Sequence, residues 1–180
     1  MRIITGKARG KKLITLEGEA VRPTTDKVKE SLFNILQFQL EGRVFLDMFS
    51  GCGQIALEAI SRGAASAVLI DASKNAASVI AQNIKSTGFE KECTLINADS
   101  IMYVKNTKLK FDIAFIDPPY RTGLAEKALE VVSEKMQPGG IIVCEHPIDE
   151  EVPETAGEFV KVKDYRYGKV VLTSYKMPGT

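Results

Sequence analysis

The sequence predicts an α/β fold, a doubly wound and mostly parallel sheet of seven strands that ends in an antiparallel hairpin. Two observations support this fold. Apolar runs alternate five times with helical patterns between residues 43 and 147, which is typical of a parallel sheet with helices on both faces. Two later runs, 159–165 and 169–175, flank a short turn near Tyr167 and Gly168, which predicts the closing hairpin.

The chain opens with a segment that we expect to form a short β-hairpin, followed by a helix. Residues 2–5 and 11–15 can pair across the turn at 6–10. Residues 24–40 carry a single apolar stripe at helical spacing, which predicts a helix that packs on the core. The possible N-caps of this helix are Thr24, Thr25 and Asp26.

The main sheet follows, with strands and helices in alternation. Strands are expected at 44–47, 67–70, 93–98, 111–116 and 141–145, and helices at 54–62, 73–87, 100–106 and 123–136. The sequence Gln137-Pro138-Gly139-Gly140 predicts a stop of the last helix before the fifth strand. We therefore expect one domain over residues 1–180, made of an N-terminal arm at 1–23, a helix at 24–40 and the α/β core at 43–177.

A glycine-rich turn between the first strand and its helix predicts a cofactor site. Gly51 and Gly53 let the backbone turn tightly and approach a ligand closely, and the start of the helix adds free N–H groups. Asp71 ends the next strand about 20 residues further on, where a ribose-binding acid is expected. These features fit either a nicotinamide dinucleotide or S-adenosylmethionine.

Two acidic residues favour S-adenosylmethionine. Asp47 precedes the glycines, where a carboxylate would repel a pyrophosphate but suits an ammonium and a sulfonium. Asp99 follows the third strand and can accept a hydrogen bond from an adenine amino group. With Asp71 and Asp117, four acids are expected along the sheet edge where ligands bind in such folds. The expected cofactor-binding residues are Asp47, Phe49, Ser50, Gly51, Gly53, Asp71, Ala98 and Asp99.

The tetrapeptide Asp117-Pro118-Pro119-Tyr120 follows the fourth strand and predicts the catalytic residues. Proline has no N–H to donate, so these residues must leave the sheet as a stiff loop. The Asp117 carboxylate and the Pro118 carbonyl can accept both N–H bonds of an amino group on a base, while Tyr120 stacks on the ring. The target base must then be unpaired or flipped out of its helix.

The charge of the chain is near neutral overall but is unevenly distributed. Residues 1–30 carry a net charge of +4, and the remaining residues carry −3. A basic arm beside a slightly acidic body is the pattern expected for a nucleic-acid substrate. The expected RNA-binding residues are Arg2, Lys7, Arg9, Lys11, Lys12, Arg22 and Thr24.

Composition argues against a membrane protein and against a metal site. No apolar stretch approaches the length of a membrane span, so we expect a cytoplasmic protein. Cys52, Cys93 and Cys144 lie far apart without the spacing of metal ligands. His146 is the single histidine and has no partner in the sequence, so we expect a structural role for it.

Several of these motifs together resemble the bacterial 16S ribosomal RNA guanine-N2 methyltransferases of the RsmD family, which are Rossmann-like class I enzymes. The resemblance rests on residues 22–34, 46–53 and 117–120 and on Tyr167-Gly168. The glycine loop departs slightly, because it reads Ser50-Gly51-Cys52-Gly53 where the family usually has Ala-Gly-Ser-Gly.

The resemblance implies transfer of a methyl group from S-adenosylmethionine to the N2 amine of one guanine in 16S ribosomal RNA. It also implies rRNA processing as the cellular role, a substrate within an assembling or assembled small ribosomal subunit, and a monomeric enzyme.

Three other functions remain open at this point. A DNA adenine-N6 methyltransferase would use the same Asp-Pro-Pro-Tyr chemistry, but 180 residues leave little room for a DNA-reading domain. A non-catalytic RNA-binding or ribosome assembly protein could keep this fold. A nicotinamide-dependent oxidoreductase would need the glycine loop but not the tetrapeptide.

Overall fold

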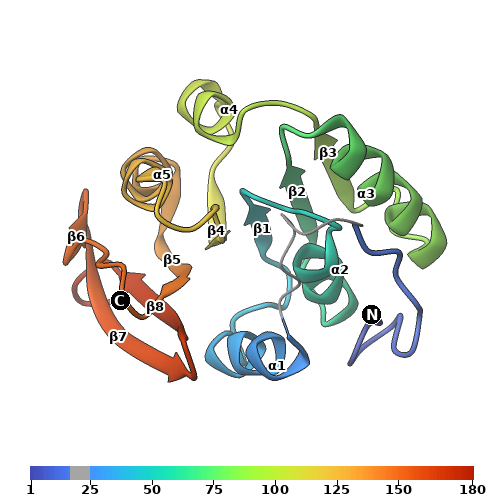
Figure 1. Cartoon of the computed structure of the whole chain (residues 1–180), viewed down its shortest axis with the longest axis horizontal. Helices are drawn as coiled ribbons and strands as arrows, with labels where there is room; N and C mark the ends of the chain where they lie inside the picture. The colour runs from blue at the N-terminus through green and yellow to red at the C-terminus, as the bar shows by residue number, and fades with distance from the viewer. Residues whose placement is uncertain (17–24) are drawn as a thin grey trace.

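A computed structural model describes residues 1–16 and 25–180 of the chain. It contains one eight-stranded sheet in the order β3-β2-β1-β4-β5-β8-β7-β6, in which β1 to β5 are parallel (Figure 1). The helices are α1 Asp26–Ile35, α2 Gln54–Ser61, α3 Lys74–Thr87, α4 Ser100–Asn106 and α5 Leu124–Ser133. The strands are β1 Val44–Asp47, β2 Ser66–Ile70, β3 Cys93–Ile96, β4 Phe111–Ile116, β5 Met136–Pro147, β6 Thr155–Ala156, β7 Phe159–Tyr167 and β8 Val170–Lys176.

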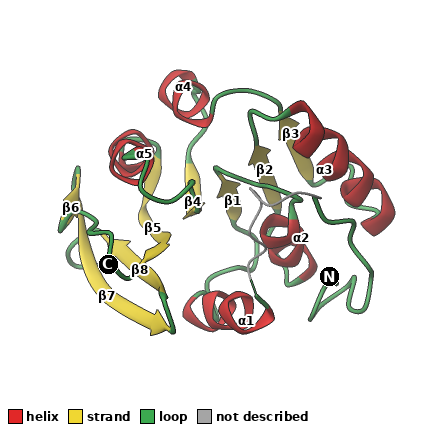
Figure 2. Ribbon diagram, viewed as in Figure 1, coloured by secondary structure: helices red, strands yellow, loops and turns green. Residues whose placement is uncertain are grey.

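Helices cover both faces of the sheet, as expected from the alternating sequence (Figure 2). One hydrophobic core lies under α1, α2 and α3, and it includes Phe45 and Phe115 from the strands. The other lies under α4 and α5, and it includes Leu46 and Ile116. Neighbouring strand residues thus point to opposite faces, because side chains alternate along a strand. Burial of both faces explains why the parallel strands are continuous apolar runs.

The C-terminal half of the sheet confirms one expectation and corrects another. The hairpin of β7 and β8 is confirmed, and β8 pairs antiparallel with β5. The count of seven strands is wrong, because Thr155 and Ala156 form a short edge strand that pairs with Val160 and Phe159. A two-residue strand lacks the alternation that would reveal it in the sequence.

The fifth strand also starts earlier than its sequence suggests. It begins at Met136, which pairs with Phe111, and a register shift follows before Ile113 pairs with Ile141. The expected helix at 123–136 ends at Ser133 instead. The turn-forming sequence at 137–140 therefore lies within the irregular first part of the strand, not at a helix stop.

The N-terminal segments are shorter than predicted. The expected hairpin is a single antiparallel bridge between Arg2 and Lys12, with turns between them. The expected helix at 24–40 spans Asp26–Ile35, and the side chain of Thr25 caps it by accepting a hydrogen bond from Val28 N–H at 3.3 Å. The proposed cap Thr24 lies outside the described residues.

Residues 1–13 of the arm are nevertheless firmly packed against α2. Ile3, Ala8 and Leu13 are buried in the core beneath that helix. Ser61 Oγ accepts a hydrogen bond from Ala8 N–H at 2.9 Å and donates one to the Thr5 carbonyl at 2.7 Å. Residues 1–13 are therefore a folded part of the domain, and not a loose basic tail.

We expect Gly6→Ala to destabilise the fold much more than Gly10→Ala. Both glycines have positive φ, +96° and +85°, but a Cβ on Gly6 would lie 1.8 Å from the Ser61 carbonyl oxygen, whereas Gly10 has open space. Gly10→Ala should therefore lower the free energy of unfolding by about 1 kcal/mol, and Gly6→Ala by at least about 3 kcal/mol. Urea denaturation of both variants measures the difference, and equal losses would contradict the close approach.

Candidate active site at the ends of β1 and β4

A cavity of about 430 Å³ lies where the strand order reverses, between the carboxyl ends of β1 and β4. This is the position at which ligands bind in open α/β sheets. The cavity is lined by Met1, Thr15, Leu16, Thr25, Asp26, Asp47, Phe49, Ser50, Gly51, Cys52, Gln54, Ile55, Phe115 and Asp117. The first half of the glycine loop and the first residue of the Asp-Pro-Pro-Tyr loop thus meet at one site.

Asp47 is the last residue of β1 and is only 1% exposed, although it borders the cavity. Its Oδ2 accepts a hydrogen bond from Ser50 Oγ at 3.0 Å, and its Oδ1 makes no hydrogen bond within the described part of the chain. Burial raises the pKa of Asp47 to about 7, and the charge of Asp71 adds to this shift, while the Ser50 hydroxyl opposes it. Asp47 is therefore a buried acid that a cationic ligand would ionise.

The glycine loop has the geometry that the sequence predicts. Gly51 and Gly53 adopt φ of +61° and +86°, in the left-handed region that favours glycine. Gly53 immediately precedes α2, and a Cβ there would lie 3.2 Å from a methyl group of Leu69. Asp71 Oδ2 accepts a hydrogen bond from Gly51 N–H at 2.9 Å, so this carboxylate fixes the loop. It lies next to the cavity lining without belonging to it.

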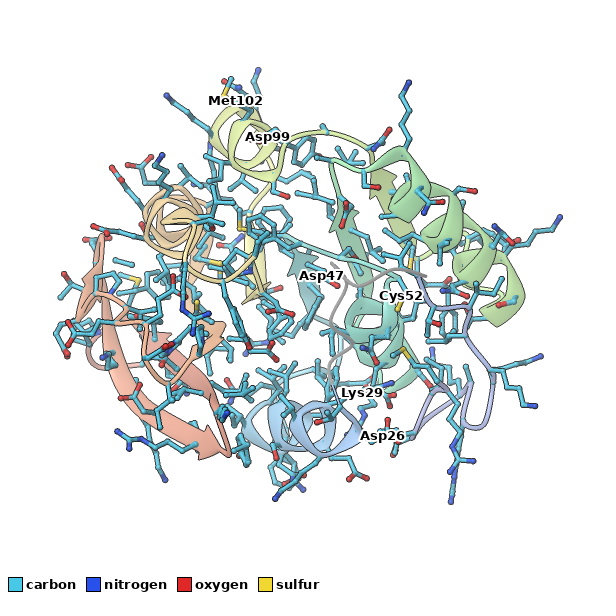
Figure 3. The ribbon with its side chains drawn as sticks, viewed as in Figure 1. Asp26, Lys29, Asp47, Cys52, Asp99 and Met102 are labelled. Atoms are coloured by element: carbon cyan, nitrogen blue, oxygen red, sulfur yellow. The ribbon has the colours of Figure 1, made fainter. Side chains whose placement is uncertain are left out.

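The structure places Asp99 differently from the other three acids. It is exposed and caps α4, where its side chain accepts a hydrogen bond from Met102 N–H at 2.9 Å. Figure 3 shows Asp99 and Met102 together on α4, apart from Asp47 and Cys52. Neither Asp99 nor Ala98 lines the cavity. One carboxylate oxygen of Asp99 accepts the capping hydrogen bond, and the adenine contact at Asp99 stays a prediction.

The Asp-Pro-Pro-Tyr loop leaves the sheet directly after β4. Asp117 and Tyr120 are half-buried, Pro118 is buried and Pro119 is exposed. The Pro119 carbonyl accepts a hydrogen bond from Thr122 Oγ1 at 2.8 Å. No hydrogen bond within residues 1–16 and 25–180 ends at the Pro118 carbonyl, so this oxygen is available to a ligand.

Arg121 connects the exposed side of the Asp-Pro-Pro-Tyr loop to Asp149 and Glu150. Its guanidinium pairs with the Asp149 carboxylate at 2.6 Å, and its backbone N–H donates to Glu150 Oε2 at 3.3 Å. The hydrogen bond to Arg121 holds the pKa of Asp149 below its usual value. Both side chains are largely exposed, so the pair orients the loop more than it stabilises the fold.

Comparison with known proteins decides the family. A family model described as conserved hypothetical protein 95 matches residues 1–176 of the chain. The chain belongs to this family.

Two relatives confirm the resemblance to RsmD enzymes. Ribosomal RNA small subunit methyltransferase D of Haemophilus influenzae is 35% identical over 150 residues, which cover 81% of this chain and 78% of that protein. YlbH of Bacillus subtilis, which carries the provisional name of an rRNA methyltransferase, is 33% identical over 184 residues, which cover 99% and 100%.

A solved structure supports the same assignment. The yhhF protein of Escherichia coli, described provisionally as a methyltransferase, matches this fold with a TM-score of 0.86 and 28% identity, and the match covers 100% of this chain and 99% of that chain. The predicted Rossmann-like class I fold is therefore confirmed. The division into a single domain stays a prediction.

In this RsmD-family protein, the five described cations of the arm lie at the surface. The side chains of Arg2, Lys7, Arg9, Lys11 and Lys12 are exposed. Arg22 and Thr24, the other two expected RNA contacts, lie outside the described residues. Ile3, Ala8 and Leu13 are buried, whereas these five cations remain at the surface, where a polyanion can reach them.

Two polar residues that the sequence analysis did not single out attach the arm to α2 and α3 of the RsmD-family fold. Glu58 of α2 accepts hydrogen bonds from Ile4 N–H at 2.8 Å and Thr5 N–H at 3.0 Å. Asn83 of α3 is fully buried and bonds both the N–H and the carbonyl of Ile14, at 2.8 and 2.9 Å. Asn83 also donates to the Cys52 carbonyl at 2.8 Å, so it joins the arm to the glycine loop.

The thiols and the histidine have the structural character that the RsmD-family sequence suggests. Burial raises the pKa of the Cys52 thiol, and it raises that of Cys93 to about 12, so neither is a ready nucleophile. His146 is buried, and its Nε2 lies 2.7 Å from Thr173 Oγ1, which donates to Asp164 at 2.6 Å. This network joins β5, β7 and β8.

Neither a metal centre nor a membrane-spanning helix is found among the described residues. Over residues 1–16 and 25–180, no group of three or more His, Cys, Asp or Glu side chains is placed to bind a metal ion. Among the same residues, none of the helices combines the length and hydrophobicity that crossing a bilayer requires.

Proposed function

We propose that this protein methylates the exocyclic N2 amine of a guanine in 16S ribosomal RNA, with S-adenosylmethionine as the methyl donor. The observation that carries this proposal is the placement of Asp117 and Asp47 on one cavity, at the ends of neighbouring strands. Relatives named ribosomal RNA small subunit methyltransferase D, 35% and 29% identical to this chain, supply the class of substrate.

The residues of the cavity fit S-adenosylmethionine, which supplies an electrophilic methyl group when bound. The Oδ1 of Asp47 is buried and accepts no hydrogen bond within the described chain, so an ammonium or sulfonium would meet an unmatched acceptor. The left-handed glycines Gly51 and Gly53 allow the backbone to approach the cofactor. Phe49 and Ser50 complete this wall of the cavity.

Asp117 and Pro118 would orient the nucleophile. The lone pair of a guanine amine is shared with the ring, so the amine is a weak nucleophile. Acceptance of its two N–H bonds by the Asp117 carboxylate and the Pro118 carbonyl favours a pyramidal nitrogen whose lone pair is free to attack. The consecutive prolines fix both acceptors before the reaction, so little reorganisation is needed. Asp117 can take the proton after the new bond has formed, and Tyr120 would stack on the base.

One transfer experiment tests the proposal. Radiolabelled S-adenosylmethionine is offered to unmodified small ribosomal subunits, naked small-subunit RNA and unmethylated DNA, and the labelled nucleoside is identified. We expect label in N2-methylguanosine from ribosomal material, and mapping then locates the nucleotide. Label in adenine of DNA would transfer the function to a DNA methyltransferase. Cofactor binding without label in any acceptor would support the non-catalytic RNA-binding alternative, and failure to bind the cofactor would support an oxidoreductase.

Cofactor affinity should rise with pH through neutrality. Only ionised Asp47 can pair with the cofactor ammonium, and its pKa is about 7 in the folded protein. The dissociation constant should therefore be about tenfold higher at pH 6 than at pH 8. Calorimetric titrations at the two pH values measure this, and Asp47→Asn should remove the difference. The same pH dependence in the variant would assign it to another group.

The raised pKa of Asp47 also affects the stability of the empty protein. Because the folded pKa exceeds the unfolded value of 3.8, stability contributed by this group is lost as the pH rises toward 7 and above. Asp47→Asn should then raise the melting temperature at pH 8 while it weakens cofactor binding.

Charge removal on the arm should weaken RNA binding in a salt-dependent way. The double variant Lys11→Gln/Lys12→Gln removes two exposed cations, and the slope of log affinity against log salt should fall by about 1 for each phosphate that is no longer neutralised. Filter binding at several salt concentrations measures the slope. The control is Lys105→Gln/Lys108→Gln, which changes exposed lysines beyond the arm. Deletion of residues 1–12 is a poorer test, because Ile3 and Ala8 are core residues.

A further inference from the structure

A second carboxylate lies beside Asp117 at the same end of the sheet. Glu145 is near the carboxyl end of β5, and it is only 2% exposed. Carboxylates are rarely this buried without a functional or structural reason, because burial in a low dielectric disfavours their charge. The reaction proposed above assigns no role to this group.

The register of the sheet makes Glu145 the direct neighbour of Asp117. The last residue pairs between β4 and β5 are Phe115 with Val143 and Ile116 with Cys144. Asp117 directly follows the last residue of β4, and Glu145 is the next residue of β5. Neighbouring strands lie about 4.8 Å apart, so the two carboxylates start from adjacent backbone positions.

The two side chains also share one face of the sheet. Phe115 and Val143 belong to the core under α1, α2 and α3, whereas Ile116 and Cys144 belong to the opposite core. Alternation along each strand returns Asp117 and Glu145 to the Phe115 side. Phe115 and Asp117 both line the cavity. Glu145 therefore stands on the cavity side, one strand beyond Asp117.

Two further observations agree with this placement. Glu145 pairs across β5 and β8 with Leu172, which lies in the same core as Phe115. Burial raises the pKa of the Cys144 thiol, and the charges of Asp117 and Glu145 raise it further. Asp117 and Glu145 therefore both lie close enough to Cys144, the β5 residue that precedes Glu145, to affect its pKa.

We propose that Glu145 determines the specificity for guanine by accepting the N1–H of the target base, while Asp117 accepts from its N2 amine. This inference rests on the proposed function. Among the common bases, only guanine has two adjacent donors on its Watson–Crick edge, the ring N1–H and the exocyclic N2 amine. Adenine and cytosine present a ring lone pair beside their amine, which a carboxylate repels.

The base analogue 2-aminopurine tests this role, because it keeps the N2 amine but has a lone pair in place of N1–H. The transfer experiment above shows which ribosomal acceptor is methylated and at which nucleotide. Splinted ligation then places 2-aminopurine at that nucleotide of the same acceptor. The wild-type protein should methylate guanine at least about tenfold faster than 2-aminopurine. Glu145→Gln should bring the two rates within about threefold of each other, because an amide can present either its oxygen or its NH2 group to N1.

A matched control separates this role from a merely structural one. Glu151→Gln makes the same change at an exposed acid six residues further on, and it should keep the wild-type ratio. Melting temperature and cofactor binding of Glu145→Gln establish that the variant is folded. An equal loss of rate on both bases in Glu145→Gln would overturn the proposal, as would a wild-type protein that does not distinguish them. Failure of the proposed function would appear differently, as no transfer to the unmodified guanine substrate.

Discussion

Asp117→Ala should lower kcat for methyl transfer by about 10²- to 10³-fold, the loss typical for one preorganised polar group at a reacting centre. The carboxylate is expected to act only on the amine, so the dissociation constant of S-adenosylmethionine should change by no more than about twofold. The loop should keep its shape, because Pro118 remains buried and the Arg121–Asp149 pair is untouched. Single-turnover kinetics and calorimetry measure the two quantities separately.

Two further variants sharpen this test. Asp117→Asn keeps one acceptor oxygen but loses the charge, so its rate should lie between those of the wild type and Asp117→Ala. Glu151→Ala removes an exposed acid elsewhere and should leave the rate unchanged. Loss of cofactor binding in Asp117→Ala, in parallel with loss of rate, would show that Asp117 belongs to the cofactor site instead.

Glu58→Ala should have the largest effect on stability. Glu58 and Lys29 are both fully buried and form an ion pair at 3.2 Å, and Arg62 adds a second at 2.9 Å. Burial alone would raise the pKa of Glu58, but the Ile4 and Thr5 N–H groups and the two cations hold it below its usual value. Its removal leaves a buried ammonium without its counter-charge, which costs about 3–5 kcal/mol.

A double variant tests this explanation for Glu58. In Lys29→Met/Glu58→Met no buried ammonium remains, so the loss should be smaller than the sum of the two single losses. The cycle compares the wild type, Lys29→Met, Glu58→Met and the double variant by chemical denaturation. Glu90→Ala is the control at an exposed acid. Additive losses would mean that the ion pair itself contributes little. Glu58→Ala should also release the arm, seen as faster amide exchange at Ile4 and Thr5.

The sheet and the central part of the site could be predicted because their signals are local. Each parallel strand is an apolar run, and the Asp-Pro-Pro-Tyr loop follows its strand directly. Asp99 shows the limit of local reasoning. An acid after a strand also precedes a helix, where Asp is a preferred N-cap, and in the structure its side chain caps α4.

The attachment of the arm could not be predicted in the same way. The partners that Glu58 and Asn83 bond in the arm lie 53 to 69 residues away along the chain. One signal was nevertheless present in α2. This helix is apolar on nearly every side, because the residues around Glu58 are Ile55, Ala56, Leu57, Ala59 and Ile60. Such a helix is buried, so an acid within it must find buried partners.

The hydrogen bonds by which Asn83 joins Ile14 to the Cys52 carbonyl have a consequence for the order of folding. During synthesis, residues 1–16 leave the ribosome well before α3, so Ile14 cannot bond Asn83 until about 70 further residues have emerged. Closing so long a loop is slow compared with forming a helix. The cavity wall of Met1, Thr15 and Leu16 should thus be completed late. Until then, the nascent chain exposes its most basic segment beside the ribosomal RNA of the ribosome that is translating it.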